Sequence, residues 1–284
     1  MTTTVQPTAS RAAGGAGPLG TGSRFTRVLG IVVLVMVAFQ LALALWWSPP
    51  ELLQGQAVRL FYLHVPMAIT GGYLAVGLLA VGSIGYLWKR TPFWDLLAAS
   101  AGELALLFTG LTLLTGSLWG RPVWGTYWEW DPRLTLTAVL FLLLVGYRAM
   151  RNAITDPDVR ARRSAVIGLL AAADVPLVRL SVDWWRGLHQ TTTLNPLDPE
   201  LDGLMLFTFF FSMVTFAALF LWLLVHRFRL AWLDEQVAAH GLQDAIAERR
   251  REAAPAPAAP SAAGEAPAPR VADPAVADAA GGAS

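Results

Sequence analysis

The sequence predicts an all-α integral membrane protein with six transmembrane helices, both termini in the cytoplasm and a tryptophan-rich loop facing outward. Hydrophobic residues make up 55% of the 284 residues and charged residues only 14%, whereas a soluble domain averages about 25% charged. Six apolar stretches are each near the ~20 residues that cross a bilayer. Lys and Arg gather on one side of these stretches, which fixes the orientation.

The six predicted spans are Val28–Trp47, Leu60–Trp88, Leu96–Leu118, Leu134–Tyr147, Ala165–Val182 and Leu204–His226. The fourth is short, and Pro132 offers an earlier start for it. An even number of spans places both termini on one side. That side holds Arg24, Arg27, Lys89, Arg90, Arg148, Arg151, Arg160, Arg162, Arg163, Arg227 and Arg229, and the other holds Arg59, Arg121, Arg133 and Arg186. Positive residues favour the cytoplasm, so the sparser side faces outward.

Outside the spans the chain changes composition at both ends. Residues 1–24 are predicted to be a flexible tail and 25–227 the six-span membrane domain. Residues 228–251 have apolar positions at helical spacing, which predicts a cytoplasmic amphipathic helix against lipid or protein. Residues 252–284 are rich in Ala and Pro, and their lack of large apolar side chains predicts disorder.

Composition also limits the chemistry. The net charge of +1 gives no reason to expect nucleic acid as a partner. The absence of Cys excludes disulfides, thiolate metal sites, iron–sulfur clusters and a Cys-x-x-Cys-His haem attachment. A metal or cofactor must therefore depend on Met, carboxylates or the four histidines His64, His189, His226 and His240.

The loop between spans three and four is dense in aromatic residues. It carries Trp119, Trp124, Trp128 and Trp130, with Tyr127 among them. Tryptophan and tyrosine also anchor helix ends at the membrane surface, which is the simpler interpretation. The density here favours instead an aromatic shelf for a large planar apolar ligand.

Two histidines are predicted on the same side as this loop. His64 lies about one turn into the second span, and His189 lies in the last outward loop. Each alone is explained by a hydrogen bond at the membrane interface. Together they suggest a convergent pair, because two neutral imidazoles complete the coordination of a haem iron. His226 and His240 lie on the other side and receive no role.

These residues carry a family resemblance. The string Trp124–Asp131 reads Trp-Gly-x-x-Trp-x-Trp-Asp, the WWD signature of haem-handling proteins, and Arg133-Leu134-Thr135 follows it. Leu63-His64-Val65-Pro66 and the segment Ser181–Gln190 complete the pattern. In this order the blocks resemble the CcmC family, the haem-presenting components of bacterial cytochrome c maturation system I. The resemblance covers about residues 25–230.

The resemblance implies a haem transfer factor in the bacterial inner membrane rather than a conventional enzyme. Haem b would be held non-covalently at the periplasmic face, with His64 and His189 as axial ligands. The residues that would support the porphyrin and meet the haem chaperone CcmE are Trp119, Trp124, Trp128, Trp130 and Asp131. CcmE would then take haem covalently, and CcmA, CcmB and CcmD would complete the system. This chain has no Walker A string for an ATP-dependent step.

Several charged residues remain open to two interpretations. Haem propionates need cations, and Arg59, Arg121, Arg133 and Arg186 are the outward candidates. Arg133 and Arg186 are equally suited to cap a helix or to pair with Asp131 or Asp183. Within the spans, Glu103, Asp174 and Arg179 are expected to face the bundle and pair, with Asp174 and Arg179 as a local pair around Pro176. A role in guiding haem or protons is the alternative.

Three rival functions are weighed against this one. A b-type membrane cytochrome that carries electrons across the bilayer uses two haems and four histidines, and only two lie on the relevant side here. A CcsA-like haem–apocytochrome synthetase is larger, with more spans and histidines. A transporter or structural subunit explains six spans but not the convergence of His and Trp.

Overall fold

The computed structural model describes residues 22–185, 187–189, 194–195, 198–199, 201 and 203–253. Most of both predicted tails therefore lies outside the described residues. The described part is helical apart from one two-stranded antiparallel sheet. The elements are α1 (Arg24–Ala42), η1 (Leu43–Trp47), α2 (Val58–Ile69), η2 (Thr70–Ala75), α3 (Val76–Lys89), α4 (Pro92–Trp124), α5 (Pro132–Ala153), α6 (Pro157–Trp184), β1 (Leu194–Asn195), β2 (Asp198–Pro199) and α7 (Gly203–Ala253).

All six predicted spans are present as helices long and apolar enough to cross a membrane. The fourth begins at Pro132, as its proline suggested, and runs to Ala153. The second, Val58–Lys89, is continuous through the π-helical segment η2, which includes Gly71 and Gly72. The sequence therefore gives the number and order of the spans correctly, and the structure lengthens most of them.

Local sequence explains where the helices begin and end. Asp131 and Asp156 are the N-caps of α5 and α6, and each carboxylate accepts a hydrogen bond from a backbone N–H three residues later. A proline follows each cap, in the first turn where its missing N–H costs nothing. Gly125 ends α4 as its C-cap. It has a φ of 80°, a left-handed conformation that glycine adopts without strain.

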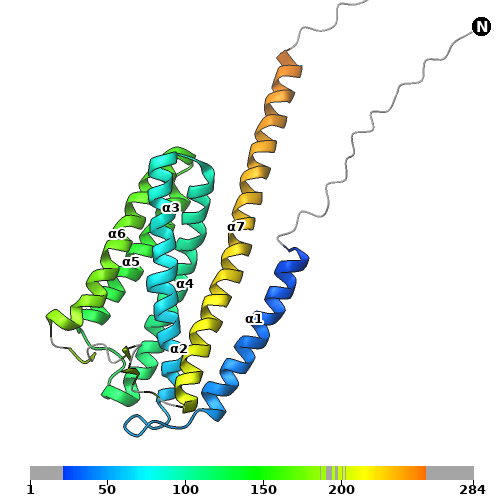
Figure 1. Ribbon diagram of the computed structural model, residues 1–284. Coiled ribbons are helices and arrows are strands. Elements are labelled where there is room, and N and C mark those ends of the chain that lie inside the picture. Colours follow the sequence, from blue (N-terminus) through cyan, green and yellow to red (C-terminus); the bar gives the residue numbers. More distant parts are fainter. Residues whose placement is uncertain are drawn as a thin grey trace, which may run out of the picture. The chain divides into compact units, whose positions relative to one another are not determined.

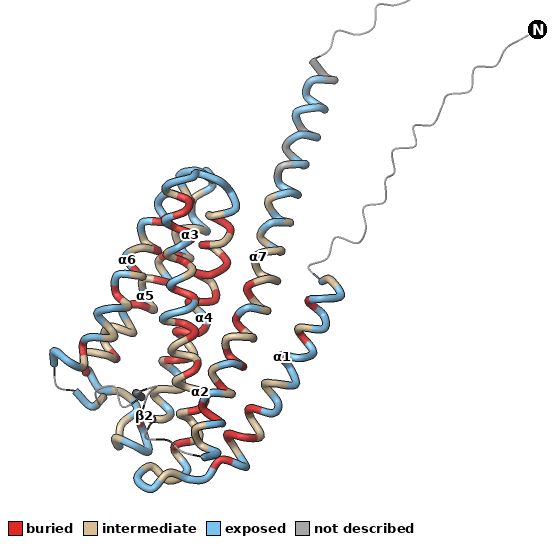
Figure 2. Tube along the Cα trace, in the orientation of Figure 1, coloured by how far each residue is buried: buried red, intermediate tan, exposed pale blue. Residues whose placement is uncertain are grey.

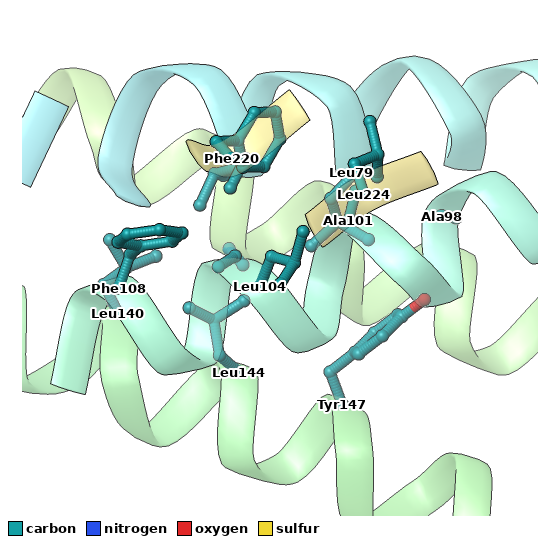
Figure 3. Close-up of a cluster of buried hydrophobic side chains, with 14 of the residues drawn as sticks. Leu79, Ala98, Ala101, Leu104, Phe108, Leu140, Leu144, Tyr147, Phe220 and Leu224 are labelled. Atoms are coloured by element: carbon teal, nitrogen blue, oxygen red, sulfur yellow. The ribbon is translucent and has the colours of Figure 1, made fainter. Parts of the chain in front are cut away.

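A single large apolar cluster packs α3, α4, α5, α6 and α7 together. Its buried residues line the inner faces of these helices in Figure 2, and Figure 3 draws ten of them with labels. Tyr147 and Phe108 are among its largest fully buried side chains. Gly102 lets α4 approach α5 closely, because a Cβ there would lie 2.5 Å from the Tyr147 ring.

One end of the bundle holds the short connections 90–91 and 154–156. It is called the opposite end here, because it lies away from the tryptophan-rich loop. At this end, charged side chains link neighbouring helices. Arg151 of α5 forms a bidentate pair with Asp95 of α4 at 2.5 and 2.9 Å. Nearby, Glu103 of α4 pairs with Arg148 at 3.0 Å and with Arg227 of α7. The prediction that Glu103 faces the bundle and pairs is confirmed. Such partners offset the cost of holding a carboxylate inside a membrane span.

The last helix differs from the prediction. Residues 228–251 are helical, but they continue the sixth span without a break, so α7 runs from Gly203 to Ala253. The chain divides after Gln236 into two compact parts. The described residues of the second part form only the last turns of α7, with mostly exposed side chains.

Candidate functional site

The residues singled out by sequence gather at the other end of the bundle, here called the tryptophan end. It is formed by the end of α4, the loop 125–131, the start of α5, part of α2 and residues 187–189 after α6. These segments lie toward the lower end of the view in Figure 1. The structure therefore brings together residues that are more than a hundred positions apart in the sequence.

His64 is held on α2 by a hydrogen bond to α4. Its Nδ1 lies 3.1 Å from Thr115 Oγ1, which itself donates to the Leu111 carbonyl at 2.7 Å. Because the hydroxyl has only one proton, it accepts from His64 Nδ1–H, and Nε2 keeps its lone pair. The ring of Trp119 lies 5.5 Å from the His64 ring. Gly116 has no side chain to displace this imidazole, since a Cβ there would lie 2.8 Å from it.

His189 is held in the same manner by a carboxylate. Its Nδ1 lies 2.7 Å from Asp131 Oδ2, and its backbone N–H donates to the same oxygen at 3.3 Å. The other oxygen of Asp131 accepts from the Leu134 N–H at 2.8 Å, which is the N-cap of α5. Asp131 therefore fixes a helix and a histidine at once. The Trp124 ring packs edge-on against His189 at 4.7 Å.

The pair Asp131–His189 favours a carboxylate facing a neutral imidazole. Burial lowers the pKa of His189, and this outweighs the hydrogen bond to Asp131, which raises it. Burial alone would raise the pKa of Asp131, but the hydrogen bonds from His189 and the Leu134 N–H lower it below its ordinary value. Near neutral pH, Nδ1 carries the proton toward Asp131 and Nε2 is available as a ligand.

The two histidines lie within electrostatic range of each other. His64 is close enough to interact electrostatically with His189 and with Arg133. His189 likewise interacts with Arg133. The described residues contain no cluster of three or more His, Asp or Glu suited to hold a metal ion.

The four tryptophans do not form one flat shelf. Trp119 lies against His64 and donates to Gln54 Oε1 at 3.1 Å, and Trp124 lies against His189. Trp128 and Trp130 meet at an interplanar angle of 81°. The Trp128 Nε1 is buried without a hydrogen-bond partner, and Trp130 is 77% exposed. Two rings therefore flank the histidines, and two form a separate edge-to-face pair.

Trp130 also lines an apolar hollow of about 330 Å³ between α5 and α6. The other residues around it are Pro132, Thr135, Leu136, Leu177, Trp184 and Trp185. Trp184 and Trp185 are half-exposed aromatic residues at the end of α6. The hollow extends the aromatic surface of this end beyond the four tryptophans of the loop.

The arginines predicted to face a ligand have different environments. Arg59 has a buried Nε without a hydrogen-bond partner, while Arg121 folds back onto the Gly125 carbonyl and lies 5.6 Å from the Tyr127 ring. Arg133 is half-buried beside both histidines. Arg186 lies outside the described residues.

The expected pair of Asp174 with Arg179 is wrong. Arg179 pairs with Asp183, one turn further along α6, at 3.6 Å. Spacing could have found this partner, because residues four apart on a helix lie on the same face, whereas residues five apart do not. Asp174 is buried, and its Oδ2 has no hydrogen-bond partner.

Comparison with known proteins decides the family. The family model described as "Heme exporter protein C" matches residues 16–243. This chain belongs to the CcmC family. A heme exporter protein C of Bradyrhizobium diazoefficiens is 39% identical over 191 residues, covering 67% of this chain and 71% of the relative. Those of Haemophilus influenzae and Escherichia coli K12 are 31% and 32% identical, covering 75% and 69% of this chain and 86% and 82% of the relatives.

Membership in the CcmC family connects the chain with haem handling in cytochrome c maturation. The matched range includes every described part of the site, from Arg59 to His189. The six membrane-spanning helices agree with a multi-pass protein of the bacterial inner membrane. What the arrangement contributes beyond the family is the support behind each histidine, Thr115 for His64 and Asp131 for His189.

Proposed function

We propose that this chain binds haem b at the periplasmic end of its helix bundle, with His64 and His189 as axial ligands, and delivers it to the haem chaperone CcmE. Haem is the cargo in this proposal. The main support is that the two imidazoles are hydrogen-bonded in the same way. Each has its Nδ1 engaged by a fixed acceptor, Thr115 or Asp131, so that Nε2 is the atom left to bind iron.

The surroundings of the two ligands fit a flat apolar molecule. Trp119 lies beside one imidazole and Trp124 beside the other, within 5.5 and 4.7 Å between ring centroids. Aromatic faces and edges contribute stacking in addition to the burial of apolar area. Arg133, within electrostatic range of both histidines, adds a cation that suits the carboxylates at one edge of haem, and Arg59, near the start of the helix that carries His64, is a second candidate.

The two ligands are also held differently, which suits a carrier that releases its cargo. His64 lies within α2, whereas His189 lies in the segment after α6. Segments outside regular helices open more readily than helix interiors. We infer that His189 is the ligand exchanged when CcmE takes the haem, and that the exposed Trp130 lies on the face that CcmE meets. CcmA, CcmB and CcmD complete the proposed assembly.

The proposed orientation follows the positive charges. Both termini would lie in the cytoplasm, with the tryptophan end facing the periplasm. Arginines 148, 151 and 227, which form the ion pairs of the opposite end, would then lie toward the cytoplasmic side. A pair of membrane histidines at one end accommodates one haem, so a b-type cytochrome that uses two haems is not supported. A CcsA-like haem–apocytochrome synthetase is not supported either, because it has more spans and more histidines.

The test is a spectrum of the full chain purified from haem-replete cells. We expect the absorption spectrum of a six-coordinate bis-His haem, and its transfer to added CcmE. Replacing both His64 and His189 with Ala should abolish the spectrum. His226→Ala is the matched control, because His226 packs against Trp222 on α7 away from these two histidines. An unchanged spectrum in the double variant would refute the proposal.

A further inference from the structure

Arg179 and Asp183 form a charged pair near the end of α6. They lie one turn apart on α6, and Arg179 Nη1 is 3.6 Å from Asp183 Oδ2. This separation is too long for a hydrogen bond. The same Nη1 atom is buried and has no hydrogen-bond partner. The pair is therefore weak, and it leaves a guanidinium donor unsatisfied.

A second guanidinium lies within electrostatic range of this one. Arg133, in the first turn of α5, interacts electrostatically with Arg179, Asp183 and Asp131. Of these two carboxylates, Asp131 is already engaged by His189 and by the backbone of Leu134. Of the two carboxylates, Asp183 is the one left to balance Arg133 and Arg179 among the described residues. Two like charges in a partly apolar environment repel each other, and the repulsion is relieved by an anion between them.

The position of this pair relative to the histidines identifies the anion. Arg133 interacts with His64 and with His189 as well as with Arg179. Arg133 thus connects the two imidazoles with Arg179, and we infer that a ligand whose centre is bound by the imidazoles extends one edge toward this pair of arginines. An arginine fork matches the geometry of a carboxylate and binds it through two parallel hydrogen bonds.

We propose that Arg179 acts with Arg133 to bind a carboxylate of the haem cargo, and that Asp183 holds Arg179 in its place when the cargo is absent. This inference rests on the proposed function. Arg179 and Asp183 have side chains 39% and 45% exposed, so both can change partner without repacking the core. Asp183 competes with the cargo carboxylate for one guanidinium. This competition weakens haem binding but offers a ready partner to Arg179 when haem leaves.

The experiment compares haem with its dimethyl ester, in which both carboxylates are blocked. Arg179→Gln should weaken haem binding by about tenfold to a hundredfold, the range of a hydrogen bond between charged groups. It should leave the affinity for the ester unchanged. Arg179→Lys keeps the charge without the fork and should lie between. Arg163→Gln is the matched control, because Arg163 is an exposed arginine near the start of the same helix.

Asp183→Asn tests the competition from the other side. Removal of the competing carboxylate should tighten haem binding and slow transfer to CcmE, again with no effect on the ester. An equal loss of haem and ester affinity in Arg179→Gln would mean that Arg179 only supports the fold, and no loss would equally overturn the proposal. In either case a bis-His spectrum that depends on His64 and His189 would leave the proposed function standing. Failure of the unmodified chain to bind haem would overturn both.

Discussion

The two ends of the helix bundle use charged groups in different ways. At the opposite end two carboxylates are paired with arginines: Asp95 is held by Arg151, and Glu103 is shared by Arg148 and Arg227. At the tryptophan end, Arg59 Nε, Trp128 Nε1 and Arg179 Nη1 are buried without hydrogen-bond partners. Buried polar groups in a native protein are normally satisfied. Unsatisfied polar atoms also occur toward the opposite end, Arg160 Nε and Tyr147 Oη among them. What distinguishes the tryptophan end is that its unsatisfied donors lie among the residues proposed to bind haem.

The helix α4 connects these two ends. Its first turns carry Asp95 and Glu103, and its last turns carry Thr115, Trp119 and Trp124. The ion pairs fix α4 against α5 and α7, so that its other end presents the aromatic and hydrogen-bonding groups to the histidines. In the proposed function, one end thus supplies rigidity and the other supplies the haem ligands. Mutations at the two ends should separate stability from haem affinity.

The largest expected effect is on stability, at the opposite end. In Asp95→Asn, the Arg151 guanidinium loses its bidentate carboxylate, although its side chain is only 8% exposed. Breaking a buried ion pair in this way costs about 3–5 kcal/mol. We expect a much lower thermal midpoint in detergent, with the haem affinity of the folded fraction unchanged.

The control for this variant is Asp158→Asn. Asp158 accepts a hydrogen bond from Tyr86 at 3.0 Å and lies in an exposed position, so its loss should cost far less. Equal destabilisation by the two variants would show that burial of the Asp95 pair is not what gives the opposite end its rigidity.

The next effect is on haem affinity, at the tryptophan end. Asp131→Asn keeps an N-cap for α5 but removes the negative charge behind His189. Loss of such a partner to a metal-binding histidine typically costs tenfold to a hundredfold in affinity, roughly. We expect weaker haem binding by titration, with little change in stability.

Asp156→Asn is a matched control for Asp131→Asn. Asp156 caps α6 as Asp131 caps α5, through a hydrogen bond of the same 2.8 Å length, but it lies at the opposite end. If both variants lost affinity equally, the effect would come from helix capping rather than from the contact with His189.

The difference between the two ends also explains what the sequence could predict. Hydropathy and length sufficed for the six spans, and Pro132 already indicated an earlier start for the fourth. The shared role of Asp131 was not foreseeable, because His189 lies 58 positions away in sequence. Arg148 and Arg227, the partners of Glu103, also lie far from it in sequence, so the sequence predicted only that Glu103 has a partner. The role of Thr115 was not predictable either, because its hydroxyl reaches His64 only through the packing of α2 against α4.

The smallest expected effect is on the pH dependence of haem affinity, and it tests the role of His189. Burial lowers the pKa of His189 below the ordinary histidine value of about 6.5, so the imidazole stays neutral as pH falls through that value. Haem affinity should be flat from pH 8 to about 6.5 and decline only below, by up to about tenfold per pH unit, as protons compete with iron for Nε2.

Asp131→Asn sharpens this prediction. Asp131 raises the pKa of His189 against burial, so its neutralisation should lower that pKa further. The acid decline of haem binding in the variant should then move to lower pH, even though the variant binds haem more weakly at neutral pH. Haem titrations from about pH 4.5 to about pH 8 bracket the ordinary histidine pKa. They measure both the affinity at neutral pH and the pH at which binding declines. A decline that moved to higher pH, or did not move, would mean that the acid limb belongs to a group other than His189.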